Sequence, residues 1–382
     1  MKFSEKILLR FPHPTEEHPV SYHQLLLQTL SDAGFPNAKV PLSVLQKLYS
    51  IYQINSQANS DLYTVTLVYQ EHSWTVIFIE AGDTRDTHYG LAVDYGSTTI
   101  IMQLVNLNTG EILAQSSEPN GQIIYGTDIL SRITYTMENP AHMDDLQKVT
   151  IETFDKLLHN LTKISGIQAA DCPVLIISGN TTMIHFLLKL DARTVFFAPY
   201  APVTMNPGWF SGKELGMHFN GICYIIPAAS NYVGGDIISG LLTLDFYKKE
   251  EIGMFFDIGT NGELVIGNNQ WLIAGAGAAG PALEGYISKS GMRAQNGAVD
   301  TITIQDHQLF FTSINDEKPI GICGSGIIDL IAQMRLQGWI NIAGKLNPEV
   351  SNRIRYITEE EAASLIAEYV ERRTYRDENR DE

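Results

Sequence analysis

The fold is decided by residues 90–101, which read GLAVDYGSTTII. A short apolar run ends at Asp94, and the chain then turns through glycine and hydroxyl-bearing residues into a second apolar run. The pattern returns in residues 254–265, MFFDIGTNGELV, where Asp257 takes the place of Asp94. Two copies of a strand, an Asp-x-Gly-hydroxyl turn and a second strand predict two similar lobes that face each other across a cleft.

The turn in each copy suits a phosphate group. Glycine lets backbone N–H groups approach phosphate oxygens closely, and the neighbouring hydroxyls donate further hydrogen bonds. The aspartate at the strand end supplies a hard oxygen ligand where a Mg²⁺ ion bridging the phosphates would lie. One Asp-x-Gly alone would be explained as an ordinary β-turn. Two copies in equivalent settings favour a pair of phosphate-binding hairpins.

The pair resembles the first and second phosphate motifs of the actin, sugar-kinase and Hsp70 ATPase superfamily. More narrowly, the chain from about Ile79 to Trp339 resembles the ATP-dependent reductive activators of corrinoid proteins. Six motifs in this order carry the resemblance: residues 81–84 with 90–99, 120–133, 179–183, 257–263, 280–285 and 321–329. The resemblance implies an α/β fold with two ribonuclease H-like, actin-like ATPase lobes, preceded by a small α/β domain.

The resemblance also implies roles for individual residues. Asp94 and Asp257 would hold Mg²⁺ and position the attacking water. Nucleotide contacts would come from Gly96, Ser97, Thr98, Gly259, Thr260, Asn261, Gly280, Glu284, Gly324 and Ser325. Gly324 and Ser325 precede a predicted helix, whose free N–H groups would suit an anion. A tight turn that packs the helix against a strand explains these two residues equally well.

Composition and charge exclude several classes of protein. A chain of 382 residues is long enough for two or three domains, and 44% hydrophobic with 18% charged residues is typical of a soluble globular protein. The net charge of −17 argues against a general nucleic-acid surface or an anionic membrane as partner. We find no signal-peptide pattern and no apolar stretch long enough to span a bilayer, and therefore expect a cytoplasmic protein.

The three cysteines, Cys172, Cys223 and Cys323, are far apart and have no C-x-x-C spacing. They can form neither a disulfide framework nor a four-thiolate iron–sulfur site, so we expect them to be buried as small hydrophobic residues. Electrons would then come from a separate ferredoxin-type protein. No pair of histidines has metal-ligand spacing.

The two phosphate motifs and the order of predicted elements divide the chain into four parts. These are a small α/β domain (1–88), which the resemblance makes the middle domain of such activators, a first ribonuclease H-like lobe (89–250), a second lobe (251–357), and a charged helix and tail (358–382). In the first part we predict helices over 22–33 and 41–51 and a hairpin over 62–79. In the first lobe we predict strands over 91–94, 98–107, 111–117, 174–178 and 223–227, helices over 129–161 (interrupted at Pro140), 183–190 and 234–244, and a loop over 192–220.

The second lobe is predicted to be incomplete. Three strands over 253–274 and a helix over 327–336 are followed by a capping box at residues 358–361, which opens one short helix. We therefore expect no later strands to cover the apolar faces of Phe255 and Val265. An uncovered sheet would favour self-association through this lobe or poor order, with weak nucleotide affinity.

The leading functional hypothesis is an ATPase that drives reduction of a corrinoid (cobalamin) protein of a methyltransferase system from Co(II) to Co(I). The main alternative is a non-catalytic corrinoid-protein-binding module that has lost ATP binding, a hypothesis supported by the incomplete second lobe. A small-molecule kinase of the same superfamily is a third possibility, but no catalytic base for an acceptor site is evident beyond Asp257.

Overall fold

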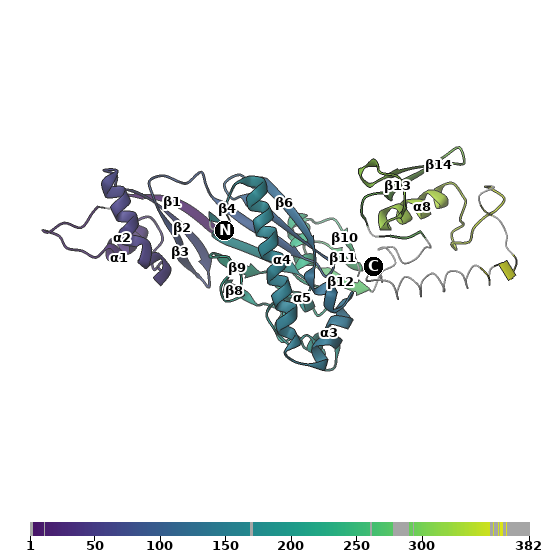
Figure 1. The fold of residues 1–382 in the computed structure, drawn as a ribbon, viewed down its shortest axis with the longest axis horizontal. Coiled ribbons are helices and arrows are strands. Elements are labelled where there is room, and N and C mark those ends of the chain that lie inside the picture. The colour runs from purple at the N-terminus through teal and green to yellow at the C-terminus, as the bar shows by residue number, and fades with distance from the viewer. Residues whose placement is uncertain are drawn as a thin grey trace. The chain divides into compact units, whose positions relative to one another are not determined.

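The computed structural model divides into two compact units (Figure 1). The first consists of Met1–Phe255 and Leu264–Gly275, and the second of Phe256–Glu263 and Ala276–Glu382. The structure describes residues 3–10, 12–168, 171–259, 262–277, 290–292, 294–351, 354, 358, 360–361 and 364. No helix among these residues combines the length and the apolar character that crossing a bilayer requires.

The first unit opens with a small α/β domain. Strands β1 (Ser4–Arg10), β2 (Leu62–Gln70) and β3 (Ser73–Ala81) form an antiparallel sheet, which shares one hydrophobic core with helices α1 (Tyr22–Asp32) and α2 (Leu42–Gln57). The predicted helices and hairpin are confirmed. Strand β1 was not predicted, because its residues, SEKILLR, do not alternate between apolar and polar.

A six-stranded sheet follows, with the order β6-β5-β4-β7-β9-β8. Strand β5 is antiparallel to its neighbours β4 and β6, β7 and β9 run parallel to β4, and β8 is antiparallel to β9 at the edge. This is the ribonuclease H-like arrangement that the sequence predicts. The bounds are β4 (Tyr89–Tyr95), β5 (Thr99–Asn106), β6 (Ile112–Pro119), β7 (Val174–Gly179), β8 (Gly208–Ser211) and β9 (Ile222–Ile225).

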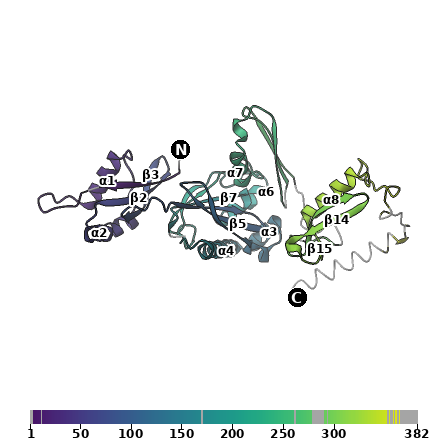
Figure 2. The same cartoon turned by 90° about the horizontal axis from the view of Figure 1, so that it is seen from above.

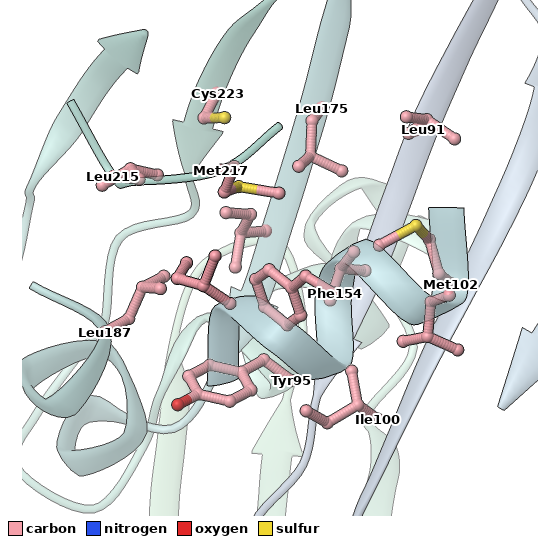
Figure 3. Close-up of a cluster of buried hydrophobic side chains, with 14 of the residues drawn as sticks. Leu91, Tyr95, Ile100, Met102, Phe154, Leu175, Leu187, Leu215, Met217 and Cys223 are labelled. Atoms are coloured by element: carbon pink, nitrogen blue, oxygen red, sulfur yellow. The ribbon is translucent and has the colours of Figure 1, made fainter. Parts of the chain in front are cut away.

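Helix α4 covers one face of this sheet. The long helical region breaks around Pro140, as predicted, into α3 (Ile129–Glu138) and α4 (His142–Ser165), and the short 3-10 helix η1 (Gly121–Tyr125) precedes them. Phe154 on α4 lies among buried side chains of the strands, including Tyr95 and Ile100 (Figure 3). The core of the lobe therefore lies directly beneath the turn that joins β4 to β5.

Further helices follow the parallel strands β7 and β9. They are α5 (Thr181–Leu187), α6 (Arg193–Phe196), α7 (Gly235–Thr243) and the 3-10 helix η3 (Phe246–Lys248). Asn180 caps α5, because its side-chain oxygen accepts a hydrogen bond from the Met183 N–H at 2.9 Å. The predicted loop over 192–220 contains α6 and β8, so that prediction was wrong in part.

A second sheet contains β10 (Gly253–Ile258), β11 (Gly262–Gly267) and β12 (Leu272–Gly277). We expected the apolar faces of Phe255 and Val265 to be uncovered, and this was wrong. Val265 is only 1% exposed, and both residues pack with Ile237 and Leu241 of α7. The covering helix precedes these strands in the chain, whereas the prediction considered only segments that follow them.

The second unit contains a sheet with the order β14-β13-β15 and the helix α8 beside it (Figure 2). Its elements are β13 (Ala298–Gln305), β14 (Gln308–Ser313), β15 (Gly321–Ile322) and α8 (Gly324–Leu336). These three strands were not predicted from the sequence, and the cover of Phe255 and Val265 comes from α7 and not from them. The alternation of Ile302 and Ile304 with threonines is the signal that could have predicted β13.

The predicted capping box at residues 358–361 is confirmed. The Thr358 N–H donates to Glu361 Oε2 at 3.0 Å, and the Glu361 N–H donates to Thr358 Oγ1 at 3.1 Å. These reciprocal bonds satisfy two donors at the start of a helix. Most of the helix that would follow lies outside the described residues.

Candidate phosphate-binding site

The candidate site is built on the turn between β4 and β5, at the centre of the six-stranded sheet. The turn contains Gly96, Ser97 and Thr98, three of the predicted phosphate contacts. A side chain at Gly96 is excluded, because its Cβ would lie 2.4 Å from the carbonyl oxygen of Thr99. The tight turn therefore requires glycine, as the predicted phosphate-binding hairpin does.

Asp94 and Tyr95 lie on opposite faces of β4, as alternate residues of a strand do. Tyr95 is fully buried, whereas Asp94 is exposed. Asp94 is in register with Ser178 on the parallel strand β7, so the two side chains are neighbours on one face of the sheet. Asp94 therefore stands at the end of its strand next to the turn, where the predicted Mg²⁺ ligand should be.

Ser178 extends this polar row to α7, because its hydroxyl lies 2.8 Å from the Ser239 hydroxyl. Gly234 allows α7 to begin close to the end of β7, because a Cβ there would lie 2.4 Å from the Asn180 Cα. Gly179 allows β7 to approach the end of β4, because a Cβ there would lie 2.9 Å from the Tyr95 carbonyl oxygen. The sequence analysis did not select Ser178 or Ser239, since an isolated serine carries no signal.

Besides Asp94, this lobe contains a carboxylate that was not predicted as a site residue, that of Asp236. It lies in the first turn of α7, where its Oδ1 accepts a hydrogen bond from the Ile237 N–H at 2.9 Å. A carboxylate there is favourable, because the N-terminus of a helix carries partial positive charge. The Gly234-Gly235 pair before it is the sequence signal that marks this helix start as unusually close to the sheet.

Two side chains from beyond β6 hold the turn between β4 and β5. Asn120 Nδ2 donates to the carbonyl oxygen of Gly96 at 2.8 Å, and Arg132 Nη2 donates to the carbonyl oxygen of Ser97 at 2.7 Å. Arg132 is fully buried. Both residues belong to the motif of residues 120–133, for which the sequence analysis proposed no role.

The second hairpin joins β10 to β11. Asp257 is half-buried near the end of β10, and Gly259 follows the strand. Thr260 and Asn261 lie outside the described residues, as do Gly280 and Glu284. The nucleotide contacts predicted for these four residues therefore stay predictions.

Gly324 and Ser325 form the first turn of α8 rather than preceding it. The Ser325 hydroxyl lies 3.2 Å from the Cys323 thiol. A Cβ on the next residue, Gly326, would lie 2.4 Å from the carbonyl oxygen of Val299 on β13. Close packing of helix on strand therefore explains this glycine, while an anion-binding role for Gly324 and Ser325 stays a prediction.

The predicted residues thus fall into two groups. Asp94, Gly96, Ser97 and Thr98 are brought together in the first unit, whereas Asp257, Gly259, Gly324 and Ser325 belong to the second. The described residues contain no group of three or more His, Cys, Asp or Glu side chains placed to hold a metal ion. A Mg²⁺ ion commonly takes only one or two carboxylates and completes its shell with phosphate oxygens and water. Asp94 beside the turn fits that donor set.

The strand order of the first lobe is that of a ribonuclease H-like domain with the actin-like ATPase fold. Residues 89–249 match the family model "RACo middle region", and residues 251–377 match "C-terminal domain of RACo the ASKHA domain". The chain therefore belongs to the family of RACo, the reductive activators of corrinoid proteins. The family model thus places the middle region at residues 89–249, whereas the resemblance had led us to expect a middle domain in residues 1–88.

Similar proteins agree with this assignment. The corrinoid activation enzyme RamQ of Eubacterium limosum is 31% identical over 265 residues, which cover 69% of this chain and 44% of RamQ. The [Co(II) methylated amine-specific corrinoid protein] reductase of Methanosarcina barkeri is 27% identical over 221 residues, which cover 55% of this chain and 40% of the relative. A solved structure of a reductive activator for corrinoid, iron–sulfur protein superposes with a TM-score of 0.80 at 34% identity, covering 94% of this chain and 57% of that one. The chain thus spans about half the length of these relatives.

Proposed function

We propose that this chain binds ATP with Mg²⁺ and uses it to activate a corrinoid protein by driving reduction of its cobalt from Co(II) to Co(I). Membership in the RACo family and the names of its relatives support the corrinoid protein as partner. The observation that supports nucleotide binding is the geometry of the turn after β4. Its glycine is sterically required, its backbone is held from one side, and Asp94 stands beside it.

The proposed reaction transfers one electron. A separate iron–sulfur protein loses the electron, and Co(II) gains it to become Co(I). ATP can assist an unfavourable transfer only if it binds more tightly to a state of the complex in which the cobalt is easier to reduce. Hydrolysis would then release the activator from that state.

The residues of the first lobe have distinct roles in this proposal. Backbone N–H groups and hydroxyls of residues 96–98 would bind phosphate oxygens, and Asp94 would hold Mg²⁺ directly or through water. Asp257 would take the equivalent position in the second hairpin and orient the attacking water. When bound, Mg²⁺ would neutralise negative charge that develops on the phosphates.

The experiment combines calorimetry of MgATP binding with ATP hydrolysis, measured with and without a Co(II) corrinoid protein. Formation of Co(I) is followed by visible absorption under a low-potential reductant. Asp94→Asn should lower MgATP affinity and turnover at least about tenfold, because the carboxylate is removed while shape is kept. Asp171→Asn is the matched control, since Asp171 is an exposed aspartate before the start of β7, at the opposite end of the strands from Asp94.

The outcomes separate the hypotheses. Binding of the corrinoid protein without any binding of MgATP would contradict the proposal and favour a non-catalytic binding module. Phosphorylation of a small molecule, with no effect on cobalt, would favour a kinase.

A further inference from the structure

Both hydrogen bonds to the turn are made to carbonyl oxygens, and this determines where its N–H groups point. In a trans peptide the C=O of one residue and the N–H of the next are directed oppositely. Because Asn120 holds the Gly96 carbonyl and Arg132 holds the Ser97 carbonyl, the N–H groups of Ser97 and Thr98 are directed away from these two side chains. The Ser97 N–H donates to no partner among the described residues. The turn therefore presents the Ser97 N–H on the side opposite Arg132.

Asn120 holds the turn with its backbone as well. Its N–H donates to the Thr98 carbonyl oxygen at 2.9 Å, and its Oδ1 accepts from the Gln122 N–H at 2.9 Å. Three consecutive carbonyls, those of Gly96, Ser97 and Thr98, thus accept hydrogen bonds from just two residues. The conformation of the turn is set by these contacts before any ligand arrives.

Arg132 is unusual because its buried charge meets only neutral acceptors. Besides the Ser97 carbonyl, its guanidinium donates to the Gly126 carbonyl at 2.9 Å, to Gln122 Oε1 at 3.2 Å and to the Met183 sulfur at 3.5 Å. Asp128, exposed one turn earlier on α3, favours the charged form but makes no ion pair with it. Burial lowers the pKa of this guanidinium, yet arginine remains charged in proteins.

The surroundings keep Arg132 in place. Gln122 is fully buried, and its Nε2 donates to the Tyr95 hydroxyl at 3.0 Å, the Thr150 hydroxyl at 2.9 Å and the Leu146 carbonyl at 3.2 Å. These bonds to Nε2 leave Oε1 facing Arg132. A buried cation without a counter-ion is costly, and an anion nearby offsets that cost. The anion that suits this place is one bound to the outward Ser97 N–H.

We propose that Arg132 and Asn120 are positioning residues for polyphosphate binding: Asn120 turns the Ser97 N–H toward the ligand, and Arg132 fixes the next peptide of the turn and adds positive potential from behind it. The choice of ATP as ligand rests on the proposed function, whereas the preference for a polyphosphate rests on the turn itself. Neither residue touches the ligand in this arrangement.

The test compares wild type with Arg132→Met, Arg132→Lys and Asn120→Asp. Methionine removes the charge and the donors at similar volume. Lysine keeps the charge but cannot donate to the Ser97 and Gly126 carbonyls together. Aspartate at 120 keeps the acceptor for the Gln122 N–H and loses the donor to Gly96. Arg193→Met is the matched control, because it removes the same charge from an exposed arginine of the same lobe.

Calorimetry with MgATP, magnesium tripolyphosphate and adenosine supplies the readout, and thermal unfolding shows which variants are folded. We expect Arg132→Met and Asn120→Asp to weaken MgATP and tripolyphosphate at least about tenfold, equal to about 1.4 kcal/mol. Adenosine affinity and Arg193→Met should change less than about twofold. Arg132→Lys should be intermediate, and it decides the matter if the methionine variant does not fold.

Three results would overturn the proposal. These are unchanged tripolyphosphate affinity in folded Arg132 and Asn120 variants, an equal loss for adenosine and for the phosphate ligands, which a merely structural role would produce, and a wild type that binds no tripolyphosphate. A wild type that binds tripolyphosphate through Arg132 but has no affinity for MgATP would instead leave this inference standing and contradict the proposed function.

Discussion

The ring of Phe255 occupies the space that a side chain at Gly240 would need. A Cβ at Gly240 would lie 2.5 Å from the tip of the ring, so only glycine lets α7 pack against β10 at this point. The contact joins the last helix of the six-stranded lobe to the first strand of the next sheet. It is the reason that the apolar face of Phe255 is covered.

Gly240→Val should therefore destabilise the protein. Overpacking of a filled site costs about 1–3 kcal/mol, which exceeds the gain of a few tenths from replacing a helical glycine by valine. The free energy of unfolding is measured by denaturant titration. Gly275→Val is the control, because a Cβ at Gly275 meets nothing within 4 Å. Equal stability of the two variants would contradict the packing argument.

Asp257→Ala should reduce ATP turnover by about a hundredfold or more, since a residue that holds metal or orients water contributes on that scale. The fold should be retained, because Asp257 is only half-buried. Glu251→Ala, which removes an exposed carboxylate just before β10, serves as the control. A folded Asp257→Ala protein that hydrolyses ATP at the normal rate would remove this residue from the mechanism.

The stability of the first lobe should decline below about pH 6.5 because of His185. This fully buried ring has its Nδ1 2.7 Å from the Thr181 carbonyl and accepts the Val203 N–H at Nε2 at 3.1 Å. These partners require the neutral ring with the proton on Nδ1. Burial lowers the pKa of His185 from its usual 6.5, although the Thr181 carbonyl and Asp191 oppose the shift.

The direction of this change in stability with pH follows from proton binding. Below about pH 6.5 the unfolded chain binds a proton at this histidine that the folded lobe does not, so stability falls by up to about 1.4 kcal/mol per pH unit. Above that pH the neutral ring is favoured in both states, and the lobe keeps its full stability. In denaturant titrations between about pH 5 and 8, His185→Gln should flatten this slope, whereas His159→Gln, at an exposed position on α4, should not. An unchanged slope in His185→Gln would disprove the assignment.

The thiols should be unreactive in the folded protein. Cys172, Cys223 and Cys323 are all buried, and burial raises the pKa of the Cys172 and Cys223 thiols to about 12. The reactive thiolate is therefore scarce near neutral pH. Ellman's reagent at about pH 8 should label no cysteine in native protein and three in denaturant. Rapid labelling of the native chain would show that a cysteine is accessible.

Much of the first lobe could be predicted from its sequence because the signals are local. Gly96 is required because a Cβ would clash within its own turn, Asn180 caps the helix that begins beside it, and Pro140 interrupts a helix at its own position. Such features depend on a few neighbouring residues, so the motif Asp-x-Gly-Ser-Thr was enough to predict the hairpin, while its phosphate chemistry stays a prediction.

Only the tertiary structure decided which distant residues complete the site. Arg132 lies 35 positions from Ser97, and Ser178 lies 61 positions from Ser239. The same holds for α7, which covers β10 and β11 although it precedes them. The physical reason is that the partner of a buried polar or apolar group is fixed by how whole elements pack. A local pattern shows that such a group needs a partner, but not which segment provides it.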